Sequence, residues 1–339
     1  MKRKVLAVML ILISVFAICI GCGTNQGGSR NAEGGKTDVR VAYFPNITHT
    51  QALFLKNQGI IEKALGAETN VTWTAFNAGP AEVEAIFAGE IDLGYIGPVP
   101  AISANVKSDG DVSIIAGATN GGTVLVSGKD VSISSVTELS GLKVAVPQLG
   151  NTQHLSLLQM LSENNMKTST NGGDVELIAA ANADIKTMMD NGQINAALVP
   201  EPWGSILQND ISANVVLDYK DIWRDGDYSA AVVIVNNDFG KKHLDIVEKF
   251  LQAHKDATVY INENLEEAKE IVNKEIQEAT NKSFDQTILD SAFNRLIISE
   301  TIPVESIWDF ANLSKEEEFI HKLPSEDTLI DQTYLEKLQ

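Results

Sequence analysis

Short β-prone segments alternate with helical segments between residues 39 and 235. Short runs rich in valine, isoleucine and leucine are typical of strands, whereas apolar residues three and four positions apart indicate helices. This alternation favours an α/β fold, in which helices cover mainly parallel sheets. From Asp238 onward the spacing predicts an almost entirely helical segment.

The expected elements form two successive cycles, which predicts two lobes. Strands are expected at residues 39–44, 71–76, 93–96, 112–118, 124–126, 142–146, 175–179, 196–199, 215–217 and 230–235. Helices are expected at residues 51–64, 81–88, 98–106, 153–164 and 183–190, with a later one through Ile288, Phe293 and Ile297. We place the crossings between the lobes near residues 121–128 and 225–230. Lobe 1 then comprises residues 38–124 and 229–339, and lobe 2 comprises residues 125–228.

The first residues have the features of an export signal. Lys2, Arg3 and Lys4 precede an apolar run that ends at Gly21 and Cys22, so residues 1–22 are expected to form a secretory leader. An uncleaved membrane anchor is the alternative, although the run is short of the ~20 residues that span a bilayer. The four residues ending at Cys22 resemble a bacterial lipobox, which implies a lipid on Cys22 and a location at the extracytoplasmic face of the cell membrane.

Residues 23–37 are small, polar and rich in glycine, and this composition is typical of a flexible tether. Cys19 and Cys22 also have the spacing of a dithiol redox pair, but such a pair needs a folded strand–helix setting. No cysteine follows Cys22, so the mature chain has no disulfide or zinc–thiolate site.

The charge and the motifs exclude several classes of protein. The formal net charge is −19, which argues against binding to nucleic acid or to an anionic membrane surface. The sequence lacks the motifs of serine hydrolases, zinc metalloproteases, P-loop NTPases and dinucleotide-binding enzymes. We therefore expect neither catalysis nor a cofactor.

Three turns between a strand and a helix are the candidate binding elements, at residues 45–51, 77–80 and 148–154. Helix N-termini carry free backbone N–H groups and the positive end of the helix dipole, so several of them together can hold an anion. In open α/β sheets, ligands bind at this end of the strands. Polar residues at a single such turn serve more often as helix caps. The nearby aromatic residues Phe44, Phe76, Tyr95 and Trp203 are candidate walls for an apolar part of the ligand.

Few ionisable side chains belong to these turns. His49 and His154 have no third ligand at metal-binding spacing, so hydrogen bonding or capping is expected for both, and no metal. Arg224 is the arginine nearest to a predicted crossing, where it either reaches the cleft or pairs with Asp225 or Asp227.

Several segments occur in an order known from one family of binding proteins. These segments are 39–44 with Pro45-Asn46-Ile47-Thr48-His49, Phe76-Asn77-Ala78-Gly79-Pro80, Ala88-Gly89-Glu90-Ile91-Asp92, Gly94-Tyr95-Ile96-Gly97-Pro98, 139–146 with Gly150-Asn151-Thr152, and Val199-Pro200-Glu201-Pro202-Trp203. Through them the chain resembles the nitrate, sulfonate and taurine family of periplasmic-type binding proteins, above all its aliphatic-sulfonate branch, over residues 38–260.

The resemblance implies a type II periplasmic-binding-protein fold, in which two hinged lobes with a helical C-terminal return close on a ligand. It further implies a monomer that delivers a small anion to an ABC permease driven by an ATPase. The implied binding residues are Asn46, Thr48, His49, Gln51, Asn77, Gly79, Pro80, Tyr95, Gly97, Pro98, Gly150, Asn151, Thr152, His154, Glu201 and Trp203. Replacing Asn151 and Thr152 with alanine is expected to weaken binding with little loss of fold.

The resemblance leaves the ligand open. An aliphatic sulfonate or taurine is the first choice, and other branches bind nitrate, bicarbonate, pyrimidine precursors of thiamine or aromatic acids. Glu201 would repel an anion unless it faced away or met a cationic group such as that of taurine. A lipid-anchored sensor without a transporter is a further alternative. An enzyme of the same fold is disfavoured because such enzymes are cytoplasmic, whereas this chain is expected to begin with a secretory leader. A transcriptional regulator of the same fold is disfavoured because it would need a helix-turn-helix ahead of the domain, and residues 1–37 contain none.

Overall fold

The structure is a computed structural model that describes residues 36–338. The expected leader, the acylation site Cys22 and all but the last two residues of the expected tether lie outside the described residues. Thr37 already belongs to the first strand, one residue before the expected start of lobe 1. Within the described part, no helix is both long and apolar enough to cross a membrane.

Six strands form the larger of two mixed sheets. They are β1 (Thr37–Tyr43), β2 (Thr69–Ala75), β3 (Leu93–Ile96), β4 (Val112–Gly121), β10 (Ser229–Asn236) and β11 (Leu296–Ile298). Their order is β11-β4-β10-β3-β1-β2. β1 pairs in parallel with β2 and β3, whereas β10 is antiparallel to β3 and β4. β3 and β4 are buried along their whole length, as expected for strands with helices on both faces.

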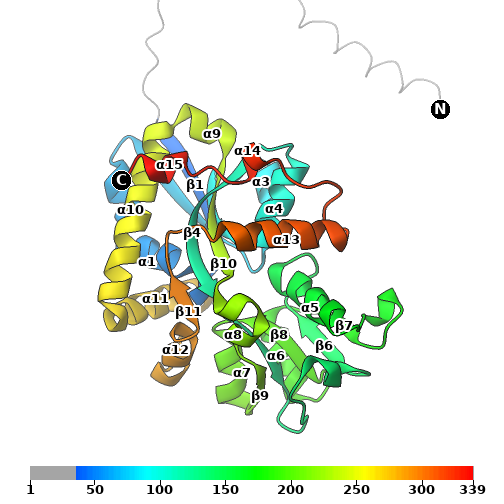
Figure 1. The fold of residues 1–339 in the computed structure, drawn as a ribbon. Helices are drawn as coiled ribbons and strands as arrows, with labels where there is room; N and C mark the ends of the chain where they lie inside the picture. Colours follow the sequence, from blue (N-terminus) through cyan, green and yellow to red (C-terminus); the bar gives the residue numbers. More distant parts are fainter. Residues whose placement is uncertain (1–35, 339) are drawn as a thin grey trace, which may run out of the picture. The chain divides into compact units, whose positions relative to one another are not determined.

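Five strands form the smaller sheet. They are β5 (Thr123–Ser127), β6 (Lys143–Val146), β7 (Glu176–Ala179), β8 (Ala196–Pro200) and β9 (Asn214–Leu217). Their order is β7-β6-β8-β5-β9, with β6 parallel to β7 and β8 and with β5 antiparallel to its two neighbours. The chain from β5 to α8 (Tyr219–Ile222) forms this sheet and the helices that pack around it (Figure 1). Its helices are α5 (Thr152–Glu163), α6 (Asn182–Asp190), α7 (Trp203–Ile211) and α8.

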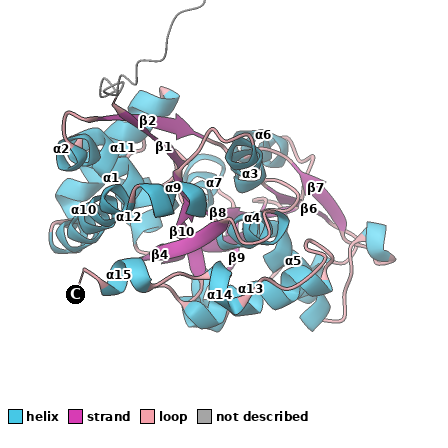
Figure 2. Cartoon of the chain, turned by 90° about the horizontal axis from the view of Figure 1, so that it is seen from above, coloured by secondary structure: helices cyan, strands magenta, loops and turns pink. Residues whose placement is uncertain are grey.

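The two faces of the larger sheet are covered by different helices, because alternate residues of a strand point to opposite faces. Val41 and Tyr43 belong to the same buried cluster as Leu53 of α1, whereas Ala42 belongs to the cluster that contains Ile102 of α4. One group of helices is α1 (Thr50–Gln58), α2 (Ile60–Leu65), α10 (Leu244–Glu263) and α11 (Leu265–Thr280). The other is α3 (Gly79–Phe87), α4 (Pro98–Lys107) and α13 (Val304–Glu316). Figure 2 shows the two groups on either side of β10.

The remaining helices are α9 (Asn237–Lys242), α12 (Gln286–Phe293), α14 (Glu326–Leu329) and α15 (Thr333–Glu336). The C-terminal return reaches both sheets, since α13 packs against α4 and also against α5, and α12 packs against α7. This return therefore ties the helices of one sheet to those of the other.

The chain passes from the larger to the smaller sheet at Gly121 and Gly122, which both have a positive φ. This point lies within the predicted interval 121–128, and the return before Ser229 lies within the predicted interval 225–230. Backbone hydrogen bonds surround the first crossing, because Gly122 donates its N–H to Arg295 and accepts one from Glu201.

The predicted α/β fold is confirmed, but two helix predictions were wrong in detail. The helix expected at residues 51–64 is interrupted at Gly59, whose left-handed backbone (φ 59°) ends α1 and precedes α2. Ile297 was assigned to a helix and lies in β11, because residues 296–298 pair with the end of β4. A strand of three residues follows a helix too closely to be separated from it by periodicity.

Candidate functional site

A narrow cavity lies between the carboxyl ends of parallel strands from both sheets. Its free volume is about 40 Å³, room for a few water-sized groups or the head group of a small anion. The larger-sheet part contributes Phe44, Asn46, Thr48, His49, Asn77, Ala78, Gly79, Gly97, Pro100 and Ala230. The smaller-sheet part contributes Pro147, Asn151, Thr152, Gln153, Asn182 and Pro200. This is the end of the strands at which open α/β sheets bind ligands.

The first turn is held by its own side chains. Asn46 accepts a hydrogen bond from the backbone N–H of Thr48 at 3.2 Å. His49 Nδ1 accepts the N–H of Phe44 at 3.2 Å, and the imidazole stacks on the Phe44 ring. Burial lowers the pKa of His49 to about 3, so the ring is neutral and carries its proton on Nε2. His49 is therefore an uncharged hydrogen-bond donor.

The third turn repeats this arrangement on the smaller sheet. Asn151 caps α5 by accepting the N–H of His154 at 2.8 Å, and His154 Nδ1 accepts the N–H of Gly150 at 3.0 Å. Burial lowers the pKa of His154 to about 4. Because Asn46 and Asn151 are caps, their replacement by alanine has a structural cost of about 1 kcal/mol each. In the double variant at Asn151 and Thr152, loss of the helix cap would therefore be combined with loss of ligand contacts. The variant tests binding less directly than the sequence suggested.

Four helices begin at this cavity: α3, α4, α5 and α6. Each N-terminus leaves backbone N–H groups without an intrahelical partner and carries a partial positive charge. Three prolines reduce the number of these donors, namely Pro98 and Pro100 in the first turn of α4 and Pro80 in that of α3. The three turns singled out in the sequence lead into α1, α3 and α5, and the resemblance implied Gly97 and Pro98 at the start of α4, so the structure adds the start of α6.

Two buried polar atoms of the cavity wall have no hydrogen-bond partner. They are Thr152 Oγ1 and Asn182 Oδ1. Buried polar atoms are rarely left unpaired, because each loses its bonds to water without compensation. Asn182 was not predicted, although it begins the helix after the strand at residues 175–179. The rule that selected the other turns would also have selected this one.

The two walls approach closely at Gly97 and Thr152. A Cβ atom on Gly97 would lie 2.6 Å from Thr152 Oγ1, which is closer than any stable contact. On the other side, the position of a Cβ on Gly150 is 3.8 Å from Pro80 Cγ. A larger residue at position 97 would therefore require the Thr152 side chain or the walls themselves to shift.

The site has no formal charge. Among residues 36–338, no lysine, arginine, aspartate or glutamate lines the cavity. Glu82, on the first turn of α3, is fully buried and its carboxyl group has no partner. Burial raises the pKa of Glu82 well above its usual value, which favours the neutral acid. The positive potential here comes from helix N-termini alone, and such a site suits an anion.

The sequence profile of the NMT1-like family matches residues 32–275 of this chain. The chain belongs to the NMT1-like family. A Bacillus subtilis (strain 168) protein provisionally named for binding aliphatic sulfonates is 23% identical over 97% of this chain and 96% of its own length. The taurine-binding periplasmic protein of Escherichia coli K12 is 29% identical over 55% of this chain and 56% of its own length.

Solved structures place the NMT1-like protein in the two-lobe fold of periplasmic binding proteins. The alkanesulfonate-binding protein SsuA of Xanthomonas axonopodis pv. citri, solved with MOPS, superposes with a TM-score of 0.71 at 17% identity. The superposition covers 87% of this chain and 97% of that one. The predicted fold class, two lobes with a helical return, is therefore confirmed.

Half of the residues implied by the resemblance line the cavity of the NMT1-like protein. These are Asn46, Thr48, His49, Asn77, Gly79, Gly97, Asn151 and Thr152. The cavity lining does not include Gln51, Pro80, Tyr95, Pro98, Gly150, His154, Glu201 or Trp203.

Several of the eight residues outside the lining form hydrogen bonds or packing contacts in other parts of the molecule. Gln51 donates to the backbone oxygen of Ala118 at 2.6 Å. The hydroxyl of Tyr95 is 2.8 Å from His254 Nδ1 in the core. Trp203 packs against the core of the smaller-sheet part.

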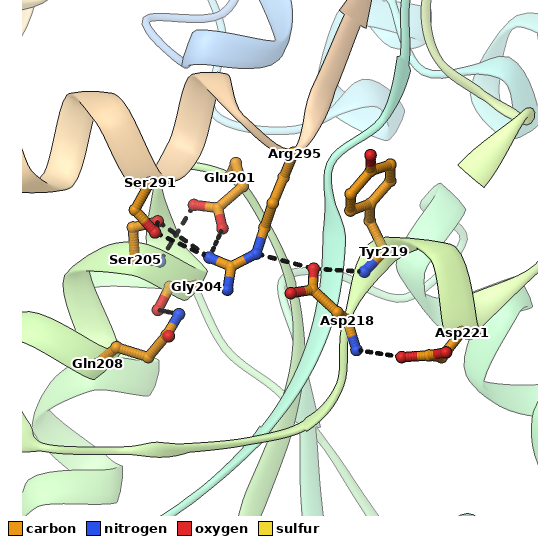
Figure 3. A network of polar contacts seen from close by, with 9 residues as sticks. All are labelled: Glu201, Gly204, Ser205, Gln208, Asp218, Tyr219, Asp221, Ser291 and Arg295. Carbon is orange, nitrogen blue, oxygen red and sulfur yellow. Dashed lines mark hydrogen bonds and ion pairs between the residues drawn. The ribbon is translucent and has the colours of Figure 1, made fainter. Parts of the chain in front are cut away.

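Glu201 belongs to a polar network that the sequence did not reveal (Figure 3). Its Oε1 accepts Arg295 Nη1 at 2.8 Å, and its Oε2 accepts the backbone N–H of Ser205 at 3.0 Å. Arg295 Nε also bonds Asp218 at 2.8 Å, so one guanidinium joins the C-terminal return to two points of the smaller-sheet part. Burial raises the pKa of Glu201, while Arg295 and Ser205 oppose this shift.

Arg224 does not line the cavity and does not pair with Asp225 or Asp227. It forms ion pairs with Glu305 and Asp309 of α13, at 2.5 and 2.6 Å. A solvent-open groove of about 560 Å³ between α1, α2, α10 and α11 shares no residue with the cavity. In the described part, no group of three or more His, Cys, Asp or Glu side chains is placed to hold a metal ion.

Proposed function

We propose that this protein is the solute-binding component of an ABC importer and binds a small organic anion, an aliphatic sulfonate or taurine first, in the cavity between its sheets. The observation that carries the proposal is the buried, unpaired hydroxyl of Thr152 in a cavity with four helix N-termini. An anion would accept from this hydroxyl and from the free N–H groups, which are the donors that neutral anion sites use. The names of the Bacillus subtilis relative and of the SsuA structure support the choice of a sulfonate.

The binding residues proposed are those that line the cavity. They are the polar and glycine residues Asn46, Thr48, His49, Asn77, Gly79, Gly97, Asn151, Thr152, Gln153 and Asn182. The lobes proposed are residues 38–124 with 229–339, and residues 125–228, which assigns each sheet to one lobe apart from the first residues of β1 and β5.

The protein's setting is part of the same proposal. A monomer anchored by a lipid on Cys22 would stand at the extracytoplasmic face of the membrane and present loaded ligand to a permease and its ATPase. Binding without catalysis is proposed because, in the described part, the Nδ1 atoms of His49 and His154 already accept the backbone N–H groups of Phe44 and Gly150, so neither atom is free to act as a base.

The test is calorimetric titration of the purified protein with ethanesulfonate, taurine, nitrate, bicarbonate, a pyrimidine precursor of thiamine and an aromatic acid. The matched variant is Thr152→Val, which keeps the shape of the side chain and removes the hydroxyl. Because Oγ1 has no partner in the protein, stability should be unchanged or slightly higher. Affinity should fall by about 10- to 100-fold, the effect of losing a hydrogen bond to a charged group.

Two outcomes would contradict the proposal. Binding of Thr152→Val with wild-type affinity would remove Thr152 from the site. Binding of only nitrate, bicarbonate, the pyrimidine or the aromatic acid would keep the transport role and replace the ligand.

A further inference from the structure

A ligand bound in this cavity meets only neutral side chains. Within residues 36–338, the lining consists of apolar, hydroxyl, amide and neutral imidazole groups. Glu201 directly follows the lining residue Pro200, but Arg295 and the Ser205 backbone occupy its two oxygens. Glu82 does not line the cavity, and its burial favours the uncharged acid. No carboxylate of the described part is therefore available to a cationic group on the ligand.

With the Thr152 hydroxyl assigned to the anionic head, Asn182 has the other buried and unpaired polar atom of the cavity wall. It is the first residue of α6, it lines the cavity, and its Oδ1 is buried without a partner. A hydroxyl on the ligand can pair with this amide in either orientation of the amide, because a hydroxyl both donates and accepts.

An ammonium group in the same place would be unfavourable for two reasons. It would lose its hydration without gaining a carboxylate partner, and unpaired buried charge is strongly destabilising. The helix N-termini that attract the anionic head would also repel the cation.

We infer that the cavity selects anions whose tail carries no positive charge, and that Asn182 sets this selectivity by presenting an amide in place of a carboxylate. The inference rests on the proposed function and narrows its ligand class. The favoured ligands are hydroxyalkanesulfonates and unsubstituted alkanesulfonates, and aminoalkanesulfonates such as taurine are disfavoured.

The test compares three sulfonates that differ only at the second carbon: ethanesulfonate, 2-hydroxyethanesulfonate and taurine. Calorimetric titration of the wild-type protein at pH 7 should give the lowest Kd for 2-hydroxyethanesulfonate and a Kd at least about tenfold higher for taurine. Taurine binding as tightly as the hydroxy compound would overturn the inference and leave the proposed function standing. Absence of binding by all three would overturn the sulfonate assignment and the inference with it.

The Asn182→Asp variant tests the role of this residue directly. An acidic residue is favourable in the first turn of a helix, so the fold should be retained. The variant should bind taurine more tightly than the hydroxy compound, a change of at least about 100-fold in their Kd ratio relative to wild type.

The matched control is Asn171→Asp, at an exposed position in the same part of the chain, which should leave the ratio unchanged. An unchanged ratio in Asn182→Asp, or the same change in the control, would overturn the assignment to Asn182. Should Asn182→Asp fail to fold, the comparison in the wild-type protein still decides whether the cavity rejects a cation.

Discussion

The ion pair between Arg295 and Glu201 gives a prediction whose size follows from burial. The Glu201 side chain is 0% exposed and that of Arg295 is 12% exposed. Replacing Arg295 with methionine keeps an apolar, unbranched side chain without the guanidinium and leaves a buried carboxylate with only the Ser205 N–H. Removing one partner of a buried pair costs about 3–5 kcal/mol, because the remaining charge is desolvated without compensation. The bond to Asp218 adds little, since that carboxylate is 42% exposed.

The chain provides a matched control in Arg224→Met. Arg224 also pairs with two carboxylates, but its partners Glu305 and Asp309 are 85% and 42% exposed. Exposed pairs contribute about 0–1 kcal/mol, so the same substitution here should cost that little. Burial is then the main difference between the two variants.

The assay is urea unfolding followed by tryptophan fluorescence, for wild type, both methionine variants, Glu201→Gln and the double variant Arg295→Met/Glu201→Gln. The neutral glutamine accepts the Ser205 N–H and removes the charge, so the double variant should recover at least about 2 kcal/mol of the loss caused by Arg295→Met.

The pH dependence has a definite sign. Burial already raises the pKa of Glu201, and loss of Arg295 raises it further. An acid with a raised pKa in the folded state loses stability as the pH rises through that pKa. The deficit of Arg295→Met should therefore be larger at pH 8 than at pH 5. Equal costs for Arg295→Met and Arg224→Met, or additive effects in the double variant, would refute the reasoning.

Two further predictions concern closure and acid stability. Gly97→Ala should weaken ligand binding about tenfold or more while the fold is retained, because its Cβ would lie 2.6 Å from Thr152 Oγ1 and keep the walls apart. Calorimetric titration measures the affinity, and small-angle scattering with ligand measures how compact the protein becomes. Wild-type affinity together with wild-type compaction on ligand binding would contradict the prediction. Burial lowers the pKa of His49 to about 3 and of His154 and His254 to about 4. The unfolded chain therefore takes up these protons first, and stability is lost as the pH falls below about 6.5. His254→Gln should make this slope shallower by about 1.2 kcal/mol per pH unit in urea unfolding between pH 6 and 4.5, and an unchanged slope would contradict a neutral His254.

The sequence predicted what depends on local pattern. Strand-forming runs and the start of α5 at Asn151 and Thr152 are determined by residues a few positions apart, so alternation and capping chemistry locate them. The carboxyl ends of parallel strands meet at one edge of a sheet, which is why turns far apart in the chain could be assigned to one site.

What could not be predicted depends on contacts between distant segments. Arg295 and Glu201 are 94 residues apart, and nothing near either residue indicates the other. Tyr95 and His254 are 159 residues apart, and their hydrogen bond places Tyr95 in the core, although its position at a strand end is equally compatible with a cavity wall. Residue type and position along a strand do not specify to which side a side chain turns when both sides are covered.

The neutral cavity and the Arg295 network meet at the end of β8. Pro200 lines the cavity, and the next residue is a fully buried carboxylate. A negative charge one residue from an anion site would weaken binding at the low dielectric of a protein interior unless a cation compensated it. Arg295 supplies that cation from the C-terminal return, so a residue beyond the part matched by the family profile (residues 32–275) makes the site compatible with an anion. Loss of Arg295 should then weaken anion binding as well as stability, and Glu201→Gln in the same chain should restore both.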